Sequence, residues 1–481
     1  MPHSTAKGSF YLAIASLVYL ASNYIIYFSL ARILSPEEFG IYSLALALVS
    51  AFAMVFASSI EPVASKLMAE AKSKAGIAGR IFSLELKISI CLFAVFILFS
   101  ASGLFAEFFK DSSLSLYFVL SSAMVLTMPL FSALYGMISG MREFRKQALL
   151  FASSALARLL LVVGFAFFGL SAFWTVAGLV LASFASLALA FFAFGKGLSG
   201  FRLFGIDAAE KRAFASQWPL IVFFALSALL TYVDIFAVKI FSPASLSNVN
   251  VAYYTAASSI SRIPYFVLST VSIVLVPLVA RHGFAKIGKT REVLRAVNRY
   301  SFILLAPAIA FLFAFSEPVL VLFYTFKYSS AALSFSLLVL AMSFFGMFIV
   351  YSNVLTALGK QKIAAMIMAF AAFLTIALNI LLVPAFSIEG AASATLISCL
   401  AAFLLSALYF LLKVKALTSW LSLARASVSA IAAAGILLFF PAFGWLLVLK
   451  FFAFILIYTA LLWALGEIRK EDFKLALRIV K

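Results

Sequence analysis

Cysteine and histidine are almost missing from this sequence of 481 residues, which has two of each. The cysteines, Cys91 and Cys399, fall in separate apolar stretches, which excludes a disulfide framework. The histidines, His3 and His282, are too few for a metal cluster or a histidine relay. We therefore expect neither a metal site nor a cofactor.

Long polar segments are missing as well. Charged residues make up 11% of the chain and hydrophobic residues 65%, and the mean hydropathy is +1.16. Soluble domains have roughly 25% charged and 45–50% apolar residues. The gaps between the apolar stretches are too short for a soluble domain, so the composition predicts an all-α polytopic membrane protein.

The apolar stretches define the predicted transmembrane helices. One span needs about 20 apolar residues, and the chain holds enough such stretches for fourteen. The predicted spans are 9–34, 39–64, 82–105, 114–140, 146–169, 171–195, 215–241, 250–280, 299–323, 328–358, 363–384, 388–412, 424–442 and 445–466.

The net charge of +19 is unevenly distributed along the chain. Lysine and arginine gather in the termini and in alternate loops, whereas the opposite loops hold little beyond Lys110, Lys327 and Lys450. This is the positive-inside pattern of a cell-membrane protein with both termini in the cytoplasm. We therefore attribute the basic residues to topology and to contact with anionic lipids, and expect no nucleic-acid partner.

Two short motifs recur and indicate an internal repeat. The sequence K-I-F-S-P at 239–243 resembles R-I-L-S-P at 32–36, and the basic loop after the fourth span resembles the one after the tenth. Six helices per copy is an even number, so the copies would enter the membrane from the same side, as a parallel repeat. The expected division is a first lobe at 1–195, a basic linker at 196–214, a second lobe at 215–412, and two extra helices with a tail at 413–481.

Two arginines within the spans are the first candidates for a binding cavity. A charge at membrane depth costs about 2.5–3.5 kcal/mol on insertion scales, so such residues face protein or water. Arg158 lies near the middle of the fifth span, where it either lines a cavity or forms a buried structural pair. Arg262 ends a helical stripe that includes Ser258 and Ser259, and Pro264 follows it. We expect Arg262, Ser258 and Ser259 to contact substrate.

Asp234 and Lys239 occupy the span before that stripe. Their spacing does not place them on one helix face, so we expect Asp234 to meet Arg262 or Arg158 across helices. Asp234 is also a candidate for binding H⁺ or Na⁺. Lys239 is a candidate for the cavity, although snorkelling to the headgroups is the favoured interpretation for a lysine at a helix end.

Further polar residues in the first lobe have two interpretations each. Asn23 belongs to a polar stripe with Tyr19, which either lines a cavity or makes interhelical hydrogen bonds. Glu61 precedes Pro62, so it is either a gate or ion ligand at a helix bend, or a solvated side chain. Glu85 opens the third span and is expected to be interfacial and structural.

Three long segments resemble a known family. They read RILSPEEFGIYSLA after the first span, YVDIFAVKIFSPASLSNVNVAYYTAASSISRIP across the seventh and eighth, and GKQKIAAMIMAFAAFLTIALNILLVPAFSIEGAASATLIS across the eleventh and twelfth. In order and spacing they resemble the polysaccharide-transport (Wzx-like) branch of the multidrug/oligosaccharidyl-lipid/polysaccharide (MOP) exporter superfamily. The resemblance extends over almost the whole chain.

The resemblance implies a flippase rather than an enzyme. Its substrate would be a polyprenyl-(pyro)phosphate-linked oligosaccharide, moved across the cytoplasmic membrane as two lobes rock around a cationic cavity. By position, Asp234 and Arg262 match an acidic and a basic residue that members of the family carry. The chain is expected to act as a monomer, with H⁺ or Na⁺ as coupling ion.

Two other functions remain open. An H⁺- or Na⁺-coupled drug or organic-cation antiporter of the same fold would depend on acidic residues, which are few here. A polyprenyl-dependent membrane glycosyltransferase would need catalytic acids in a sizeable loop or soluble domain, and the predicted extracytoplasmic loops are short and poor in Asp, Glu and His.

Overall fold

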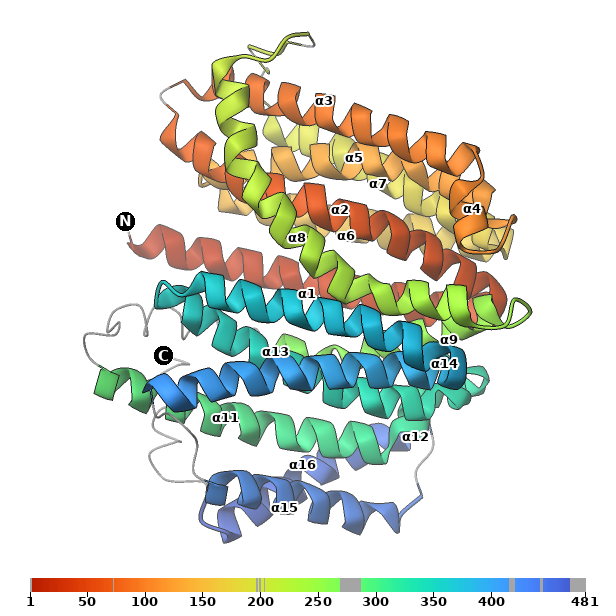
Figure 1. Cartoon of the computed structure of the whole chain (residues 1–481), viewed down its shortest axis with the longest axis vertical. Helices are drawn as coiled ribbons and strands as arrows, with labels where there is room; N and C mark the ends of the chain where they lie inside the picture. Colours follow the sequence, from red (N-terminus) through yellow and green to blue (C-terminus); the bar gives the residue numbers. More distant parts are fainter. Residues whose placement is uncertain are drawn as a thin grey trace. The chain divides into compact units, whose positions relative to one another are not determined.

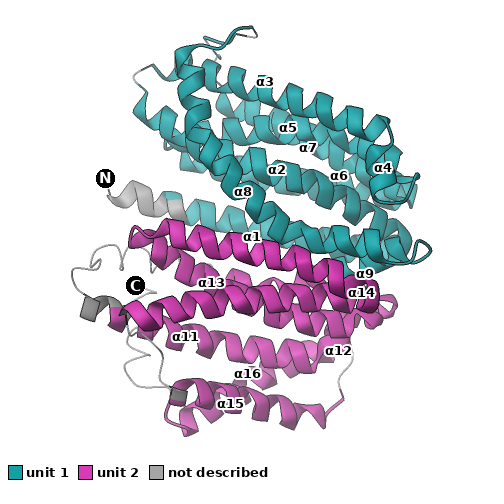
Figure 2. Ribbon diagram, in the orientation of Figure 1, with its two compact units in different colours: residues 1–255 teal, residues 256–481 magenta. Residues whose placement is uncertain are grey.

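The structure, a computed structural model, describes residues 2–71, 73–195, 198, 200–202, 204–268, 287–414, 420–441 and 444–467. Within these residues the regular secondary structure is helical, without a β-strand, which confirms the predicted all-α class. The chain forms two compact units, Met1–Thr255 and Ala256–Lys481 (Figure 2).

The first unit is a bundle of long helices (Figure 1). Its central helices pack closely: α5 lies against α2, α3 and α7, while α1 packs on α6 and α8 packs on α2. The last of these helices, α9, begins in the first unit and ends just beyond the unit boundary at Thr255. The elements are α1 (Pro2–Ile33), α2 (Pro36–Glu70), α3 (Lys74–Ala101), α4 (Leu104–Phe108), α5 (Leu114–Gly140), α6 (Phe144–Gly169), α7 (Ala172–Phe194), α8 (Ala208–Phe241) and α9 (Ser247–Ser261).

Short polar residues cap the starts of α2 and α8. The Ser35 hydroxyl accepts a hydrogen bond from the Glu38 amide at 3.2 Å, and the following proline occupies the first helical position of α2. Both choices suit a helix start, because the cap satisfies a free N–H group and proline has none. Asp207 caps α8 in the same way, accepting from the Glu210 amide at 2.9 Å.

Two glycines bring α5 into close contact with α2. A Cβ atom on Gly136 would overlap the carbonyl oxygen of Glu61, and one on Gly140 would overlap that of Ser65. These glycines are four residues apart on one face of α5, as in the small-residue motifs through which membrane helices associate. Backbone therefore packs directly on backbone along this contact.

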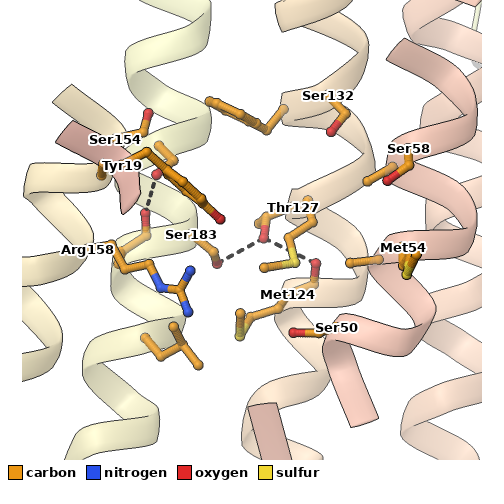
Figure 3. A pocket seen from close by; sticks show the side chains of 18 of the residues that line it. Tyr19, Ser50, Met54, Ser58, Met124, Thr127, Ser132, Ser154, Arg158 and Ser183 are labelled. Atoms are coloured by element: carbon orange, nitrogen blue, oxygen red, sulfur yellow. Dashed lines mark hydrogen bonds between the residues drawn. The ribbon is translucent and has the colours of Figure 1, made fainter. Parts of the chain in front are cut away.

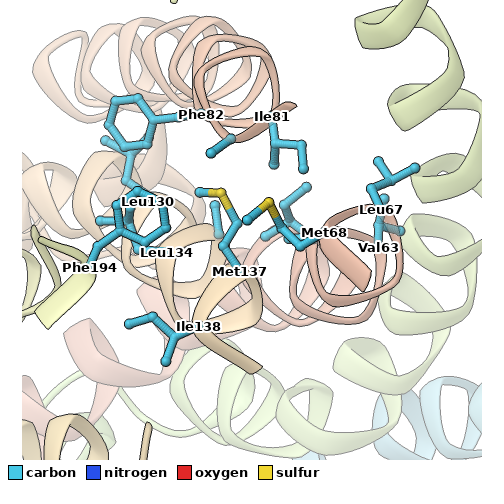
Figure 4. Close-up of a cluster of buried hydrophobic side chains, with 14 of the residues drawn as sticks. Val63, Leu67, Met68, Ile81, Phe82, Leu130, Leu134, Met137, Ile138 and Phe194 are labelled. Atoms are coloured by element: carbon cyan, nitrogen blue, oxygen red, sulfur yellow. The ribbon is translucent and has the colours of Figure 1, made fainter. Parts of the chain in front are cut away.

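An apolar core surrounds that contact (Figure 4). It joins side chains of α2, α3 and α5, and Phe194 at the end of α7 closes one side of it. The labelled members are Val63, Leu67, Met68, Ile81, Phe82, Leu130, Leu134, Met137, Ile138 and Phe194.

The second unit has its own helical packing. α13 lies along α14, and α11 contacts both α13 and α15, which in turn packs on α16. Glu467, just after α16, accepts hydrogen bonds from Arg299 at 2.8 Å and Ser422 at 2.5 Å, which ties three helices together. The elements are α11 (Ile287–Ala314), α12 (Ser316–Tyr324), the 3₁₀ turn η2 (Phe326–Ala331), α13 (Ala332–Ala357), α14 (Gln361–Val414), α15 (Trp420–Leu438) and α16 (Leu446–Ala464).

Twelve helices of the described chain are long and apolar enough to span a membrane, so this is a multi-pass membrane protein. The longest of them, α14, contains two predicted spans. It breaks at Ser387, where φ is 50° and ψ is −125°, between the predicted spans 363–384 and 388–412. The predicted span 250–280 lies partly outside the described residues. The count of fourteen therefore stays a prediction.

Candidate functional site

A cavity of about 350 Å³ lies among the helices of the first unit (Figure 3). Its walls come from α1, α2, α5, α6, α7 and α8, and they combine apolar side chains with many hydroxyl groups. Thr127 of α5 donates a hydrogen bond to Ser183 of α7 at 2.9 Å across one wall. The hydroxyl groups belong to Tyr19, Ser50, Ser58, Thr127, Ser132, Ser154, Ser183, Ser186 and Tyr232.

Arg158 brings the charge to this cavity. Figure 3 shows its guanidinium group extending from α6 into the space beside Ser183. Its Nε atom is buried and has no hydrogen-bond partner. Among the described residues that line the cavity, Arg158 is the one charged side chain. Of the two interpretations from the sequence, the structure therefore favours the cavity over a buried ion pair.

The side chains around Arg158 are polar but uncharged. The side chains that act on it electrostatically are the phenols Tyr42, Tyr19 and Tyr27, not carboxylates. A guanidinium group carries five N–H donors in a planar fork that matches the oxygens of a phosphate or carboxylate. With serine hydroxyls beside it, Arg158 forms a site suited to an anion that is rich in oxygen.

Asn23 does not line this cavity. Its side-chain amide donates to the backbone carbonyl of Tyr19, one turn earlier in the same helix, at 2.9 Å. Tyr19 is the member of the predicted stripe that reaches the cavity wall. The stripe does contribute to the site, through a different residue from the one the sequence indicated.

Asp234 has a partner that the sequence did not reveal. It is buried on α8 and accepts a hydrogen bond of 2.6 Å from the hydroxyl of Tyr254 on α9. The predicted partners were Arg158 and Arg262. Arg158 lines the cavity wall from α6, and the contact of Asp234 with Arg262, which belongs to the second unit, stays a prediction. The hydrogen bond seen for Asp234 therefore joins neighbouring helices of the first unit.

Lys239 is buried, so the prediction that it snorkels to the headgroups is wrong. Its ammonium group lies 2.7 Å from Asp111 in the turn before α5, and it also donates to Ser247 at 3.0 Å and to Asn248 at 2.7 Å. Burial alone would raise the pKa of Asp111, but hydrogen bonds from Lys239, Ser113 and Asn248 lower it below its usual value. The physical reason is local: the turn before α5 supplies a carboxylate within reach, so Lys239 pairs inside the protein.

The remaining candidates for the cavity lie at or beyond the unit boundary. Arg262 is half-buried just after the end of α9, and its carbonyl accepts from the Phe266 amide at 3.1 Å. Ser259 lies 2.6 Å from the hydroxyl of Tyr324, and the carbonyl of Ser258 accepts from Ser261 at 2.9 Å. A cavity shared by these residues and Arg158 stays a prediction.

Two acidic residues of the first unit differ from each other in burial. Glu61 is half-buried on α2, and its role as a gate or ion ligand stays a prediction. Glu85 was expected at the interface but is fully buried, because α8 covers it and Gln217 donates to it at 3.3 Å. Lys87, two residues on, pairs instead with Glu210 of α8 at 3.0 Å.

Sequence comparison identifies one family and one curated relative. The family model described as polysaccharide biosynthesis protein matches residues 5–282. An uncharacterized membrane protein of Methanocaldococcus jannaschii is 25% identical over 423 residues, which cover 86% of this chain and 99% of that protein.

Solved structures of transporters share the fold. The lipid II flippase MurJ in an inward closed conformation superposes with a TM-score of 0.78 and 16% identity, covering 95% of this chain and 98% of its own. An inward-facing multidrug resistance MATE family transporter of the MOP superfamily gives 0.71 and 12%, covering 85% and 98%. A MOP superfamily transporter from Pyrococcus furiosus gives 0.60 and 14%, covering 85% and 96%. At these identities the likeness establishes the fold.

Proposed function

Because the chain belongs to the polysaccharide biosynthesis protein family, we propose that it is a flippase for a polyprenyl-(pyro)phosphate-linked glycan. The glycan lipid would enter from the cytoplasmic leaflet and leave to the outer one as the protein alternates between inward-open and outward-open states. The membrane is the cytoplasmic membrane, and both termini are cytoplasmic. The chain acts as a monomer among anionic lipids, with H⁺ or Na⁺ as coupling ion.

The Arg158 cavity is the observation that carries this proposal. A phosphate that crosses hydrocarbon needs a positive partner in place of water, because an unpaired charge there is expensive. The unpartnered Nε of Arg158 offers a charge-assisted hydrogen bond. The surrounding hydroxyl groups suit phosphate and sugar oxygens, and the cavity has the size range of small-ligand sites.

The names of the structural neighbours support the same interpretation. One is a lipid II flippase. The Pyrococcus furiosus transporter is described as having a binding pocket of reverse polarity that suggests a different function. Pocket polarity is therefore a useful guide to substrate within this fold, and the polarity of the Arg158 cavity favours an anionic substrate.

The antiporter alternative predicts the opposite polarity. A site for organic cations would place carboxylates in the cavity, yet the described residues that line it include no Asp or Glu. Asp234 is engaged with Tyr254. The cavity therefore lacks the acidic groups by which a cation would be held.

The test is a flipping assay in proteoliposomes. The substrate is a polyprenyl pyrophosphate with a fluorescent sugar, and its appearance in the opposite leaflet is scored for wild type and Arg158→Ala. Loss of one charge-assisted contact, worth about 1.5–3 kcal/mol, should slow flipping at least tenfold. Arg145→Ala is the matched control, because Arg145 is an exposed arginine in the first turn of the same helix, α6.

Two results would contradict the proposal. If Arg158→Ala flips the glycan lipid at the wild-type rate, the cavity is not part of the transport pathway. A wild-type preparation that does not flip the glycan lipid, but exchanges an organic cation for H⁺ or Na⁺, would make the protein an antiporter.

A further inference from the structure

Three buried polar side chains meet where α2, α3 and α8 converge, away from the Arg158 cavity. Glu85 of α3, Gln217 of α8 and Ser59 of α2 are all fully buried. The Gln217 amide nitrogen donates to Glu85 Oε2 at 3.3 Å and to Ser59 Oγ at 3.1 Å. None of the three residues lines the cavity described above.

Two oxygens in this group have no hydrogen-bond partner: Oε1 of Glu85 and Oε1 of Gln217. An ionised carboxylate and an amide carbonyl are both acceptors, so they cannot bond to each other without an added hydrogen. Buried acceptors without partners are destabilising, and more so if they are charged. One hydrogen placed between the two oxygens would satisfy both of them.

The neighbouring cations are engaged with other carboxylates. On α3 and α8, Lys87 pairs with Glu210 at 3.0 Å. On α2 the nearest carboxylate in sequence is Glu61, two residues from Ser59, and α5, which also packs on α3, has no charged side chain in Leu114–Gly140. The other pairs at this end are Arg80 with Asp207 at 3.2 Å and Arg212 with Glu70 at 3.4 Å.

We infer that Glu85 is a proton-binding site. A neutral carboxylic acid at Glu85 donates its O–H to the carbonyl of Gln217 while its other oxygen accepts from the Gln217 amide. This cyclic pair satisfies both orphan oxygens with one proton. It also removes the cost of an unpaired buried charge, which no cation in the described surroundings offsets.

A route for the proton lies along the same three helices. A surface pocket of about 410 Å³ opens at their ends and is lined by Glu70, Arg80 and Arg212. Gln217 is five residues beyond Arg212, which corresponds to about 8 Å along α8. Between these positions in sequence, α3 carries Ile81 and α8 carries Ala213, and both are buried in the apolar core.

The helix that covers Glu85 has a built-in bend point. Pro219 lies inside α8, two residues after Gln217, and proline removes one helical hydrogen bond. Bending there would lift Gln217 from Glu85 and admit water from the pocket. The acid would then release its proton to water, and re-closing would require a proton to be taken up again.

The proton site gives the proposed flippase its coupling ion, and to that extent it rests on the proposed function. Proton release and uptake at Glu85 would be linked to the position of α8. A proton gradient would then bias the two conformations of the transporter. The site itself can be tested without any substrate.

The first experiment is infrared spectroscopy of the purified protein at neutral pH. Wild type should show the C=O stretch of a protonated carboxylic acid that persists in buffer. Glu85→Gln should lose this band, and Glu210→Gln should keep it, because Glu210 is a buried carboxylate with a lysine partner. A band unchanged in Glu85→Gln would overturn the inference.

Gln217→Leu provides a second variant should Glu85→Gln fold poorly. It leaves the carboxyl group in place but removes its amide partner, so the acid band should shift in frequency. A band that neither shifts nor weakens in Gln217→Leu would contradict the paired geometry.

The second experiment measures flipping of the fluorescent glycan lipid with and without an imposed pH gradient. The gradient should change the wild-type rate about tenfold, within the usual range of coupling energies. Glu85→Gln should flip at a rate that no longer responds to the gradient. Acceleration that persists in the variant, or that follows a sodium gradient alone, would overturn proton coupling through Glu85. A wild type that shows the band but no flipping would support the proton site and refute the flippase.

Discussion

Lys239, which is buried, and Arg158, which is half-buried, are two cations of the same unit with opposite surroundings. Lys239 has a carboxylate at 2.7 Å and two further acceptors at 2.7 and 3.0 Å. Arg158 has an unpartnered Nε and, among the residues that line its cavity, no acidic neighbour. The sequence indicated both residues by the same feature, a basic residue within an apolar span.

The difference separates structure from function. A buried ion pair whose donors are satisfied has little left to offer a ligand, and removing one partner is costly. A cation beside an open space keeps its hydrogen-bonding capacity for something that arrives and leaves. We therefore assign Lys239 to the architecture of the α8–α9 corner and keep Arg158 as the proposed contact for the substrate.

The largest expected effect is on stability, from Lys239→Met. The substitution leaves Asp111 without its cation, and breaking a buried pair costs about 3 kcal/mol or more. Thermal unfolding in detergent should show a markedly lower midpoint. Equal stability of the variant and wild type would show that Lys239 is not a structural residue.

Arg158→Lys tests the other side of the comparison. Lysine keeps the charge but loses the planar fork that matches phosphate, so flipping should fall about tenfold, equivalent to about 1.4 kcal/mol. Stability should change by less than in Lys239→Met, because no carboxylate lines the cavity beside Arg158 and no ion pair is broken there. A large drop in unfolding midpoint with normal flipping would reverse the assignments of Arg158 and Lys239.

The double variant Asp111→Asn with Lys239→Met tests whether the two residues stabilise the protein as a pair. Removing both charges leaves no unpaired ion, so the double variant should be more stable than Lys239→Met and only about 1 kcal/mol less stable than wild type. A double-mutant cycle measures this coupling. Strictly additive losses would mean that the two residues act independently.

The smallest expected effect is the pH dependence of the Asp111–Lys239 contribution to stability at acid pH. Because the native pKa of Asp111 is lowered, its contribution to stability is present at neutral pH and is lost as the pH falls through the ordinary Asp value of about 3.9 toward the native one. The stability difference between wild type and Lys239→Met should therefore shrink on acidification. A difference that stays constant over this range would argue against the ion pair.

The helices were the predictable part of this protein. Runs of about 20 apolar residues form helices in a bilayer, because their backbone N–H and C=O groups must be hydrogen-bonded within the segment. The break at Ser387 also falls between two predicted spans. The position of Arg158 at a cavity was also predictable, because a midplane arginine is rare and must face protein or water. Its role in transport stays a prediction.

The partners of the polar residues were not predictable. Asp111 lies 128 positions from Lys239, and Gln217 lies 132 positions from Glu85. Helical periodicity relates residues three or four apart and contains no information about which helices become neighbours. Lys239 was therefore assigned to the headgroups and Glu85 to the interface, although both are buried by helices that arrive from elsewhere in the chain.

The glycine contact between α5 and α2 has a consequence for measuring motion. With backbone against backbone at Gly136 and Gly140, the two helices cannot slide or rotate past each other without collision. The two helices should therefore move as one rigid body throughout the transport cycle. Spin labels placed on α2 and α5 would keep a constant separation, which makes this pair the internal reference frame for displacements of every other helix.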